Sequence, residues 1–144
     1  MSMHISEREK QIMHGKICAY CSQPTQFVDS KLIYGISYGM IYLCEPCDAY
    51  VGVHKGTEDA LGRVANKELR AWKKLAHKHF DEIWKKTNLS RSEAYKWLSE
   101  KLDMPADFTH IGMFNVETCK EVIRLSKLYM NSMHPIYTNK LYQV

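Results

Sequence analysis

Four cysteines in two C-x-x-C pairs are the residues of this chain with the clearest chemistry. Cys18 and Cys21 form the first pair, Cys44 and Cys47 form the second, and 22 residues separate the pairs. A two-residue spacer lets one tight turn present two sulfurs, and four thiolates complete a tetrahedral metal shell. The spacing therefore predicts a structural Zn²⁺ site at Cys18, Cys21, Cys44 and Cys47, with no open position for a catalytic water.

Other chemistry remains open for these and the neighbouring residues. A rubredoxin-like iron site or redox-active dithiols would use the same four cysteines. His54 follows Cys47 by seven residues, which allows either a substitute ligand or a hydrogen-bonded histidine at a strand end. Cys119 stands alone on an apolar helical stripe and is expected to be a small buried hydrophobic residue.

The segment that contains the cysteine pairs has the composition of a small β-sheet. Residues 32–43 are rich in β-branched and aromatic side chains, and Gly35 and Gly39 mark a bend or a hairpin turn. We predict strands near residues 25–34 and 39–44, and a third short strand at 50–54. With a cysteine pair at a strand end on each side, this is the outline of a zinc ribbon. A short helix from about Ser6 would precede it.

The rest of the chain has helical periodicity. Apolar residues recur at spacings of three and four, which predicts a helix over about residues 63–86: Leu61, Ala65, Leu69, Trp72, Ala76, Phe80 and Ile83. Ser90 and Glu93 form a capping box for the next helix, and a third helix would start at Asn115 or Thr118 and run to about Met130. The predicted fold is α+β, with a zinc-ribbon unit (1–56) packed on a three-helix unit (57–130), followed by a tail (131–144).

Length and composition limit the class of protein. The chain has 144 residues, of which 45% are hydrophobic, enough for one domain or two small units that share a core. No stretch approaches the roughly 20 apolar residues that cross a bilayer, so no membrane partner is expected. The polar first 16 residues lack the apolar segment of a secretory signal. We therefore expect the cytoplasm, where thiols stay reduced.

The excess positive charge lies in the middle of the chain. The formal net charge is +4, and residues 54–101 carry 12 basic against 7 acidic side chains. On a helical wheel a basic row lies opposite the apolar stripe: Arg63, Lys67, Arg70, Lys74 and Lys78. Such a row could follow the phosphates of DNA or RNA, or it could be an ordinary solvated face. Tyr34, Tyr38 and Tyr42, four residues apart, would share one face of a strand, either stacking on bases or packing in the core.

Several segments taken together resemble a known family. They are the two C-x-x-C pairs, C-D-A-Y-V-G-V-H at 47–54, A-L-G-R-V-A at 60–65, A-H-K-H-F-D-E-I-W at 76–84, R-S-E-A-Y-K-W-L at 91–98 and H-I-G-M-F at 110–114. This combination is similar to small bacterial and phage proteins classed as a zinc-finger-containing domain of unknown function. The resemblance covers about residues 16–128 and implies zinc at the four cysteines, but no activity. Ala60 stands where the family usually has proline.

Three functional hypotheses follow from the sequence. The first is a non-catalytic nucleic-acid-binding accessory protein that uses the basic helix. The second is a phage or mobile-element module that binds a host enzyme or defence complex, with a surface that includes Tyr129, Met130, Met133, Tyr137 and Tyr142. The third is a ββα-type metal nuclease, suggested by the order His54, Asn66 and then His77 or His79. An enzyme is the least favoured of these, because no strong catalytic motif is present.

Overall fold

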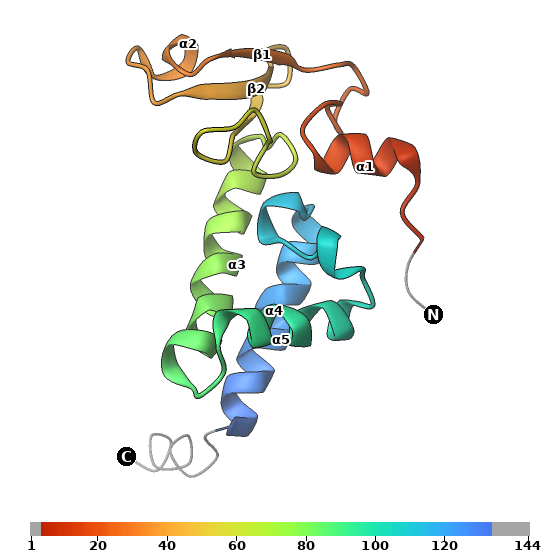
Figure 1. Ribbon diagram of the computed structural model, residues 1–144, viewed down its shortest axis with the longest axis vertical. Helices are drawn as coiled ribbons and strands as arrows, with labels where there is room; N and C mark the ends of the chain where they lie inside the picture. Colours follow the sequence, from red (N-terminus) through yellow and green to blue (C-terminus); the bar gives the residue numbers. More distant parts are fainter. Residues whose placement is uncertain (1–3, 134–144) are drawn as a thin grey trace.

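The chain forms a small sheet mounted on one end of a helical unit. The structure is a computed structural model that describes residues 4–133. In Figure 1 the sheet lies at the top, above the start of the long helix α3 (Lys67–Lys86), and the C-terminal end of the helical unit lies at the bottom. The α+β class predicted from the sequence is confirmed.

The sheet has three antiparallel strands in the order β1-β2-β3. β1 (Gln26–Asp29), β2 (Met40–Cys44) and β3 (Ala49–Gly52) are all short. The prediction of one strand over 25–34 is wrong beyond Asp29, because α2 (Lys31–Tyr34) follows and ends at Gly35 with a positive φ of 78°. A left-handed residue of this kind closes a helix and suits glycine.

The three tyrosines predicted to share one strand face therefore lie in different settings. Tyr34 ends α2, Tyr38 lies in the loop that follows, and only Tyr42 lies in a strand, where it is buried. Tyr34 and Tyr38 are 52% and 75% exposed. Of the two settings considered for these tyrosines, packing in the core holds for Tyr42 and is wrong for Tyr34 and Tyr38.

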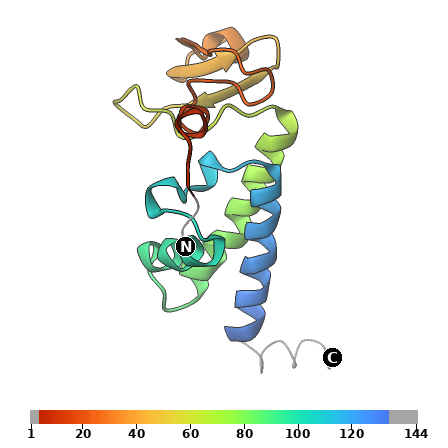
Figure 2. The same cartoon turned by 90° about the vertical axis from the view of Figure 1, so that its right-hand side faces the viewer.

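The helical unit is built around two helices that lie side by side in both ribbon views (Figures 1 and 2). α3 packs along α5 (Val116–Met133), and α4 (Arg91–Leu102) crosses their lower part. Polar side chains start each helix: Asn66 accepts from the Leu69 amide, and the predicted capping box of Ser90 and Glu93 is present. The helix predicted from 63 begins only at Lys67, because Asn66 is its cap.

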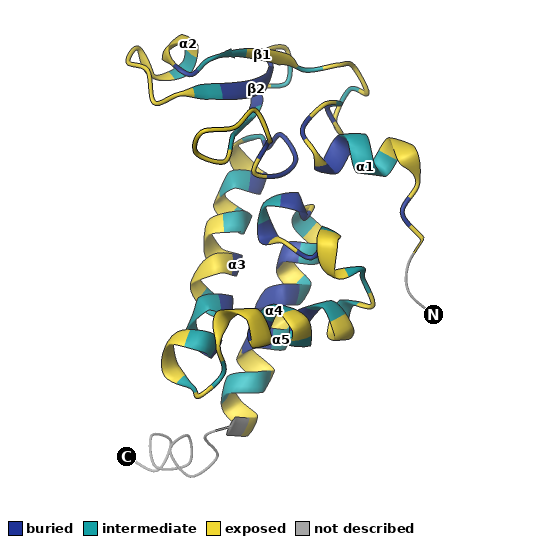
Figure 3. Cartoon of the chain, in the orientation of Figure 1, coloured by how far each residue is buried: buried dark blue, intermediate teal, exposed yellow. Residues whose placement is uncertain are grey.

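The apolar stripes of these helices meet in one buried cluster, seen as dark blue segments between the helices in Figure 3. Leu69, Ala76, Phe80 and Ile83 of α3 face Cys119 and Val122 of α5, so Cys119 is a buried hydrophobic residue as predicted. No helix within residues 4–133 is both long and apolar enough to span a membrane.

The N-terminal segment packs on the buried cluster of the helical unit, although it was predicted to belong to the zinc-ribbon unit. α1 (Glu7–Met13) is capped by Ser6, as expected for a helix near that residue. Ile5 and Met13, which flank and end this helix, belong to the same cluster as Phe80 and Val122. The chain therefore starts on the helical unit, crosses to the sheet and returns to the helical unit.

Backbone contacts join the sheet side to the helical side. Gly62 lies against Gly112 in the 3₁₀ turn η2 (Ile111–Met113), and a Cβ on Gly62 would come within 1.9 Å of the Gly112 carbonyl oxygen. The next residue, Arg63, donates its amide to that oxygen at 3.0 Å. A second 3₁₀ turn, η1 (Ala106–Phe108), precedes η2. Only glycine permits this approach of one backbone to another.

Replacing Gly62 by alanine should therefore destabilise the protein, because the added methyl group overlaps backbone atoms that have no rotamer to change. We expect a loss of roughly 1–3 kcal/mol or more in the free energy of unfolding, as in overpacked interiors. Chemical denaturation measures this loss.

Gly52→Ala is the matched control. A Cβ at Gly52 meets only the Leu61 side chain, at an ordinary 3.6 Å, so the free energy of unfolding should change by less than about 1 kcal/mol. Equal effects of the two substitutions would contradict the importance of this contact.

Candidate metal centre and the adjoining groove

The four paired cysteines lie on two turns at one end of the sheet. Cys18 and Cys21 belong to a turn closed by the isolated bridge between Ile17 and Pro24. Cys44 is the last residue of β2, and Cys47 lies in the turn that leads to β3. Each pair thus occupies a reversal of the chain, as the two-residue spacing predicted.

The two turns share a backbone feature that the sequence analysis missed. The residue after each pair, Ser22 or Asp48, has a positive φ, of 67° and 50°. The Ser22 amide donates to the Cys18 carbonyl at 2.8 Å, and the Asp48 amide donates to the Glu45 carbonyl at 3.1 Å. A left-handed residue therefore turns the chain directly after the second cysteine of each pair. Asp tolerates this conformation better than most residues.

The four sulfurs converge. All of them lie within 4.8 Å of one another, and Cys21 Sγ lies 3.6 Å from Cys44 Sγ. A tetrahedron with metal–sulfur bonds of about 2.3 Å has edges of about 3.8 Å. The sulfurs are therefore placed as one metal ion would require, and Cys18 and Cys44 are buried while the other two are partly exposed.

The electrostatic surroundings of these four thiols favour a bound cation. Burial raises the pKa of the Cys44 thiol, and burial together with the neighbouring sulfurs raises the pKa of Cys47 to about 12. The backbone amide of Gln23 acts in the other direction on Cys21 and lowers its pKa. The negative charges of several thiolates this close repel one another. A bound metal cation takes the place of the thiol protons and neutralises these charges.

Little else holds this end of the sheet together. Among residues 4–133, the buried cluster around the sulfurs contains Tyr42, Ala49, Ala60 and Val64 besides Cys18 and Cys44, with Val51 and Val53 packed against it. So few apolar side chains bury too little surface to stabilise a unit of this size. A metal ion bound by the four cysteines would supply what the small core lacks.

The basic row predicted from the helical wheel is only partly present. Arg63 was expected on the exposed helix face; instead it precedes α3 and is 8% exposed. Its Nε donates to the Met113 carbonyl at 2.8 Å. The helical wheel requires a helix at residue 63, whereas the chain bends at residues 61–63 and the Arg63 side chain is buried. Lys67, Lys74 and Lys78 are exposed on α3.

Arg70 has a structural role beside the sheet. Its guanidinium donates to the carbonyls of Ala65 and Asp48, at 2.7 and 3.3 Å, and lies 4.3 Å from the ring centre of Tyr50. This side chain connects the start of α3 to β3. It therefore fixes the angle at which the sheet sits on the helix.

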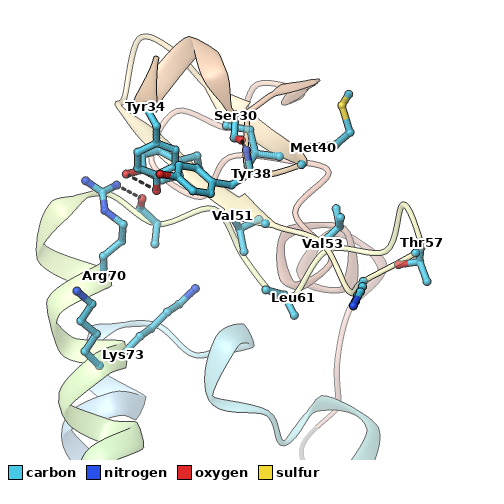
Figure 4. Close-up of a pocket in the computed structure, with 18 residues that line it drawn as sticks. Ser30, Tyr34, Tyr38, Met40, Val51, Val53, Thr57, Leu61, Arg70 and Lys73 are labelled. Carbon is cyan, nitrogen blue, oxygen red and sulfur yellow. Dashed lines mark hydrogen bonds between the residues drawn. The ribbon is translucent and has the colours of Figure 1, made fainter. Parts of the chain in front are cut away.

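A groove of about 730 Å³ opens between the sheet and α3. In Figure 4, Tyr34 and Tyr38 lie on its sheet side, and Arg70 and Lys73 extend toward them from α3. Tyr50 completes the aromatic wall, with its ring centre 6.0 Å from that of Tyr34 and the two hydroxyl groups 3.3 Å apart. The residues that line the groove include four cations and no carboxylate: Lys55, Arg70, Lys73 and Lys74.

Sequence reasoning missed Lys73, which is half-buried at the base of the groove. Its Nζ donates to the Arg63 carbonyl at 2.9 Å, and burial lowers the pKa of its ammonium group to about 8, helped by the charge of Arg63. On the helical wheel Lys73 lies between the basic row and the apolar stripe. This position borders a groove only because the sheet packs next to the start of α3.

The residues that suggested a nuclease are not brought together. Asn66 caps α3, and His79 lies on the far side of that helix from His77, whose Nδ1 is 3.9 Å from Asp81. Within residues 4–133, no group with a histidine is close enough to share a metal ion. His54 is exposed after β3, and its amide donates to the Asp59 carbonyl.

The predicted C-terminal contact surface lies partly outside the described residues, which exclude Tyr137 and Tyr142. Tyr129 and Met130 pack on the helical cluster, and Tyr129 lies 5.0 Å from Trp97, ring centre to ring centre. These two side chains contribute to the core.

Cys44→Ser should abolish stoichiometric metal binding, because a buried hydroxyl group is a poor substitute for a thiolate. Elemental analysis should find about one metal ion per chain in the parent protein and none in the variant, with loss of the cooperative thermal transition of the sheet. Cys119→Ala is the matched control, since this cysteine is buried in the helical cluster and should leave the metal content unchanged. Full metal content in Cys44→Ser would contradict the four-sulfur site.

Comparison with known proteins agrees with this site. No curated protein and no solved structure matches the chain, but a family model described as a zinc-finger-containing domain matches residues 14–129. The match spans both cysteine pairs, the groove and most of the helical unit, and it confirms the resemblance to a zinc-finger-containing domain. The chain therefore belongs to the family of zinc-finger-containing domains.

Proposed function

We propose that this protein binds unpaired bases of DNA or RNA in the groove between the sheet and α3, and that a structural Zn²⁺ on the four cysteines holds the sheet in place. The observation that carries the proposal is the lining of the groove, where three tyrosines face four cations without a carboxylate. Aromatic rings that stack on bases, beside cations that contact phosphates, are the combination found in single-strand binding sites.

The charge of the groove supports a polyanionic ligand. Lys55 and Lys74 are exposed, and neither forms an ion pair with any of the described residues. Three other cations of α3 and α5, in contrast, form ion pairs: Lys86 with Glu82, Lys120 with Glu117 and Arg124 with Glu121. A surface that keeps its cations away from acids attracts phosphate.

The tyrosines support unpaired bases over a duplex. Tyr34 and Tyr38 meet edge to face, with ring centres 5.6 Å apart, and both stay more than half exposed. Rings in a groove stack on bases that leave the helix stack, whereas a duplex presents mainly phosphates and base edges. An exposed aromatic pair that packs on no core is otherwise hard to account for.

Zinc is the metal that the donor set favours. Four thiolates in a tetrahedron suit Zn²⁺, which forms structural sites without redox chemistry. Its role here would be to tie the turn before β1 to the turn between β2 and β3, and so to help position Tyr50 against Arg70. A closed shell of four sulfurs offers no site for a reacting water, which supports a binding function over an enzymatic one.

Tyr38→Ala tests the stacking. Removing one stacked ring should weaken binding of a short single-stranded oligonucleotide by about 1–3 kcal/mol, or roughly 5- to 150-fold in Kd, measured by fluorescence anisotropy. Leu32→Ala is the control, because Leu32 of the neighbouring helix α2 is exposed like Tyr38 but does not line the groove.

If neither DNA nor RNA binds the metal-loaded protein at low salt, the proposed function is wrong. A stoichiometric protein partner that survives nuclease treatment would favour the protein-interaction hypothesis instead.

Lys74→Ala tests the phosphate contact. The slope of log Kd against log salt concentration should become shallower by about 0.7 for a single strand, because one fewer counterion is released. Lys96→Ala, on the exposed side of α4, should leave the slope unchanged. An unchanged slope in Lys74→Ala would remove this residue from the interface.

A further inference from the structure

A second cavity continues from the base of the groove between the sheet and α3, which is called the tyrosine groove below after Tyr34, Tyr38 and Tyr50. It measures about 420 Å³ and shares Val51, Leu61 and Lys73 with the groove. Its other polar lining side chains come from four separate parts of the chain: His54, His77, Arg91, Tyr95 and His110. Neither the proposed base-binding site nor the metal centre uses these five residues.

These side chains form a connected cluster. The Arg91 guanidinium lies 5.0 Å from the ring centre of Tyr95, and the Tyr95 and His110 rings are 5.8 Å apart. The positive charge of Arg91 also reaches His77 and His110, since it adds to the burial that lowers the pKa of each imidazole. The charged groups that act on these histidines from neighbouring elements are Lys73, Asp81, His54 and Asp107.

The cavity suits an anion and not a cation. Its lining has two basic side chains, Lys73 and Arg91, and no carboxylate; neither of the two forms an ion pair with another residue of the range 4–133. Asp81 lies beside the cavity, with a carboxylate oxygen 3.9 Å from His77 Nδ1, and its charge also reaches Tyr95. Among residues 4–133, no three histidine, cysteine or acidic side chains of this cavity lie close enough to form a metal site.

The number of charges points to a phosphate monoester. An internal phosphodiester carries one negative charge, whereas a terminal phosphate carries between one and two near neutral pH, because its second pKa is about 6. Lys73 and Arg91, with ring N–H groups of His77 and His110 as further hydrogen-bond donors, match the second charge as well as the first. The groove that would hold the bases leads directly to this cavity through Lys73.

We infer that the cavity of His54, His77, Arg91 and His110 binds the terminal phosphate of a nucleic-acid strand whose bases occupy the tyrosine groove. The inference rests on the proposed function and gives it a substrate class, namely strands with a phosphorylated end. Lys73 lies at the boundary and contacts both parts of the ligand.

The test compares one short oligonucleotide in three forms: with a 5′-phosphate, with a 3′-phosphate and with hydroxyl groups at both ends. The parent protein should bind one phosphorylated form about tenfold more tightly than the hydroxyl form, as expected for charge-assisted hydrogen bonds. Which form is preferred gives the direction of the strand in the groove.

The measured quantity is the Kd of the hydroxyl form divided by the Kd of the preferred phosphorylated form. Arg91→Gln should bring this ratio to within about twofold of one, and His110→Gln, a second variant in the same cavity, should reduce the ratio. Arg124→Gln is the control, because Arg124 is an exposed arginine of α5 outside both cavities. Tyr38→Ala should weaken the binding of all forms equally and keep the ratio.

Proton NMR of the imidazoles locates the effect. The phosphorylated strand should shift the His77 and His110 resonances and raise their pKa values, while the hydroxyl strand should leave both unchanged. If the hydroxyl strand binds and neither phosphate improves its affinity, the inference is overturned and the proposed function stands. If no form of the oligonucleotide binds, both are wrong.

Discussion

The convergence of four sulfurs at one end of the sheet is the constraint on which the rest of the structure depends. It joins the turn around Cys18 to the turn between β2 and β3, although 22 residues lie between the pairs. With those turns fixed, Tyr50 meets Arg70, and Arg70 sets the sheet on α3. Two backbone hydrogen bonds between Tyr50 and Ala65 reinforce this contact, and none of the four cysteines lines the groove itself.

Sequence reasoning predicted most of the framework because the framework follows local rules. The two-residue spacing of the cysteines placed them on turns, and the capping box at Ser90 marked the start of α4. Apolar periodicity found the face of α3 that packs on α5. Each of these patterns depends on residues within one or two turns of each other, so the sequence contains them directly.

The errors came from tertiary structure. Arg63 follows the helical period of the basic row, yet the chain bends before Asn66 and buries this side chain, which donates to the Met113 carbonyl, 50 residues away. Tyr34, Tyr38 and Tyr42 have strand spacing, but Tyr34 ends the short helix α2, Tyr38 lies in the loop that follows, and only Tyr42 lies in a strand. Lys73 and the three histidines near it gain their shared setting only from the way the sheet, α3, α4 and η2 meet.

The path of the chain has a consequence for how the protein folds. Ile5 and Met13 pack among the helices, so the polypeptide leaves the helical core, makes the sheet and re-enters the same core. The sheet is thereby an insertion within a discontinuous helical unit, tethered at both ends. The helical partners of Ile5 follow the sheet segment along the chain, so the hydrophobic residues of α1 can pack on them only after the whole sheet segment has been synthesised. The four cysteines can come together before that packing, because all of them precede α3.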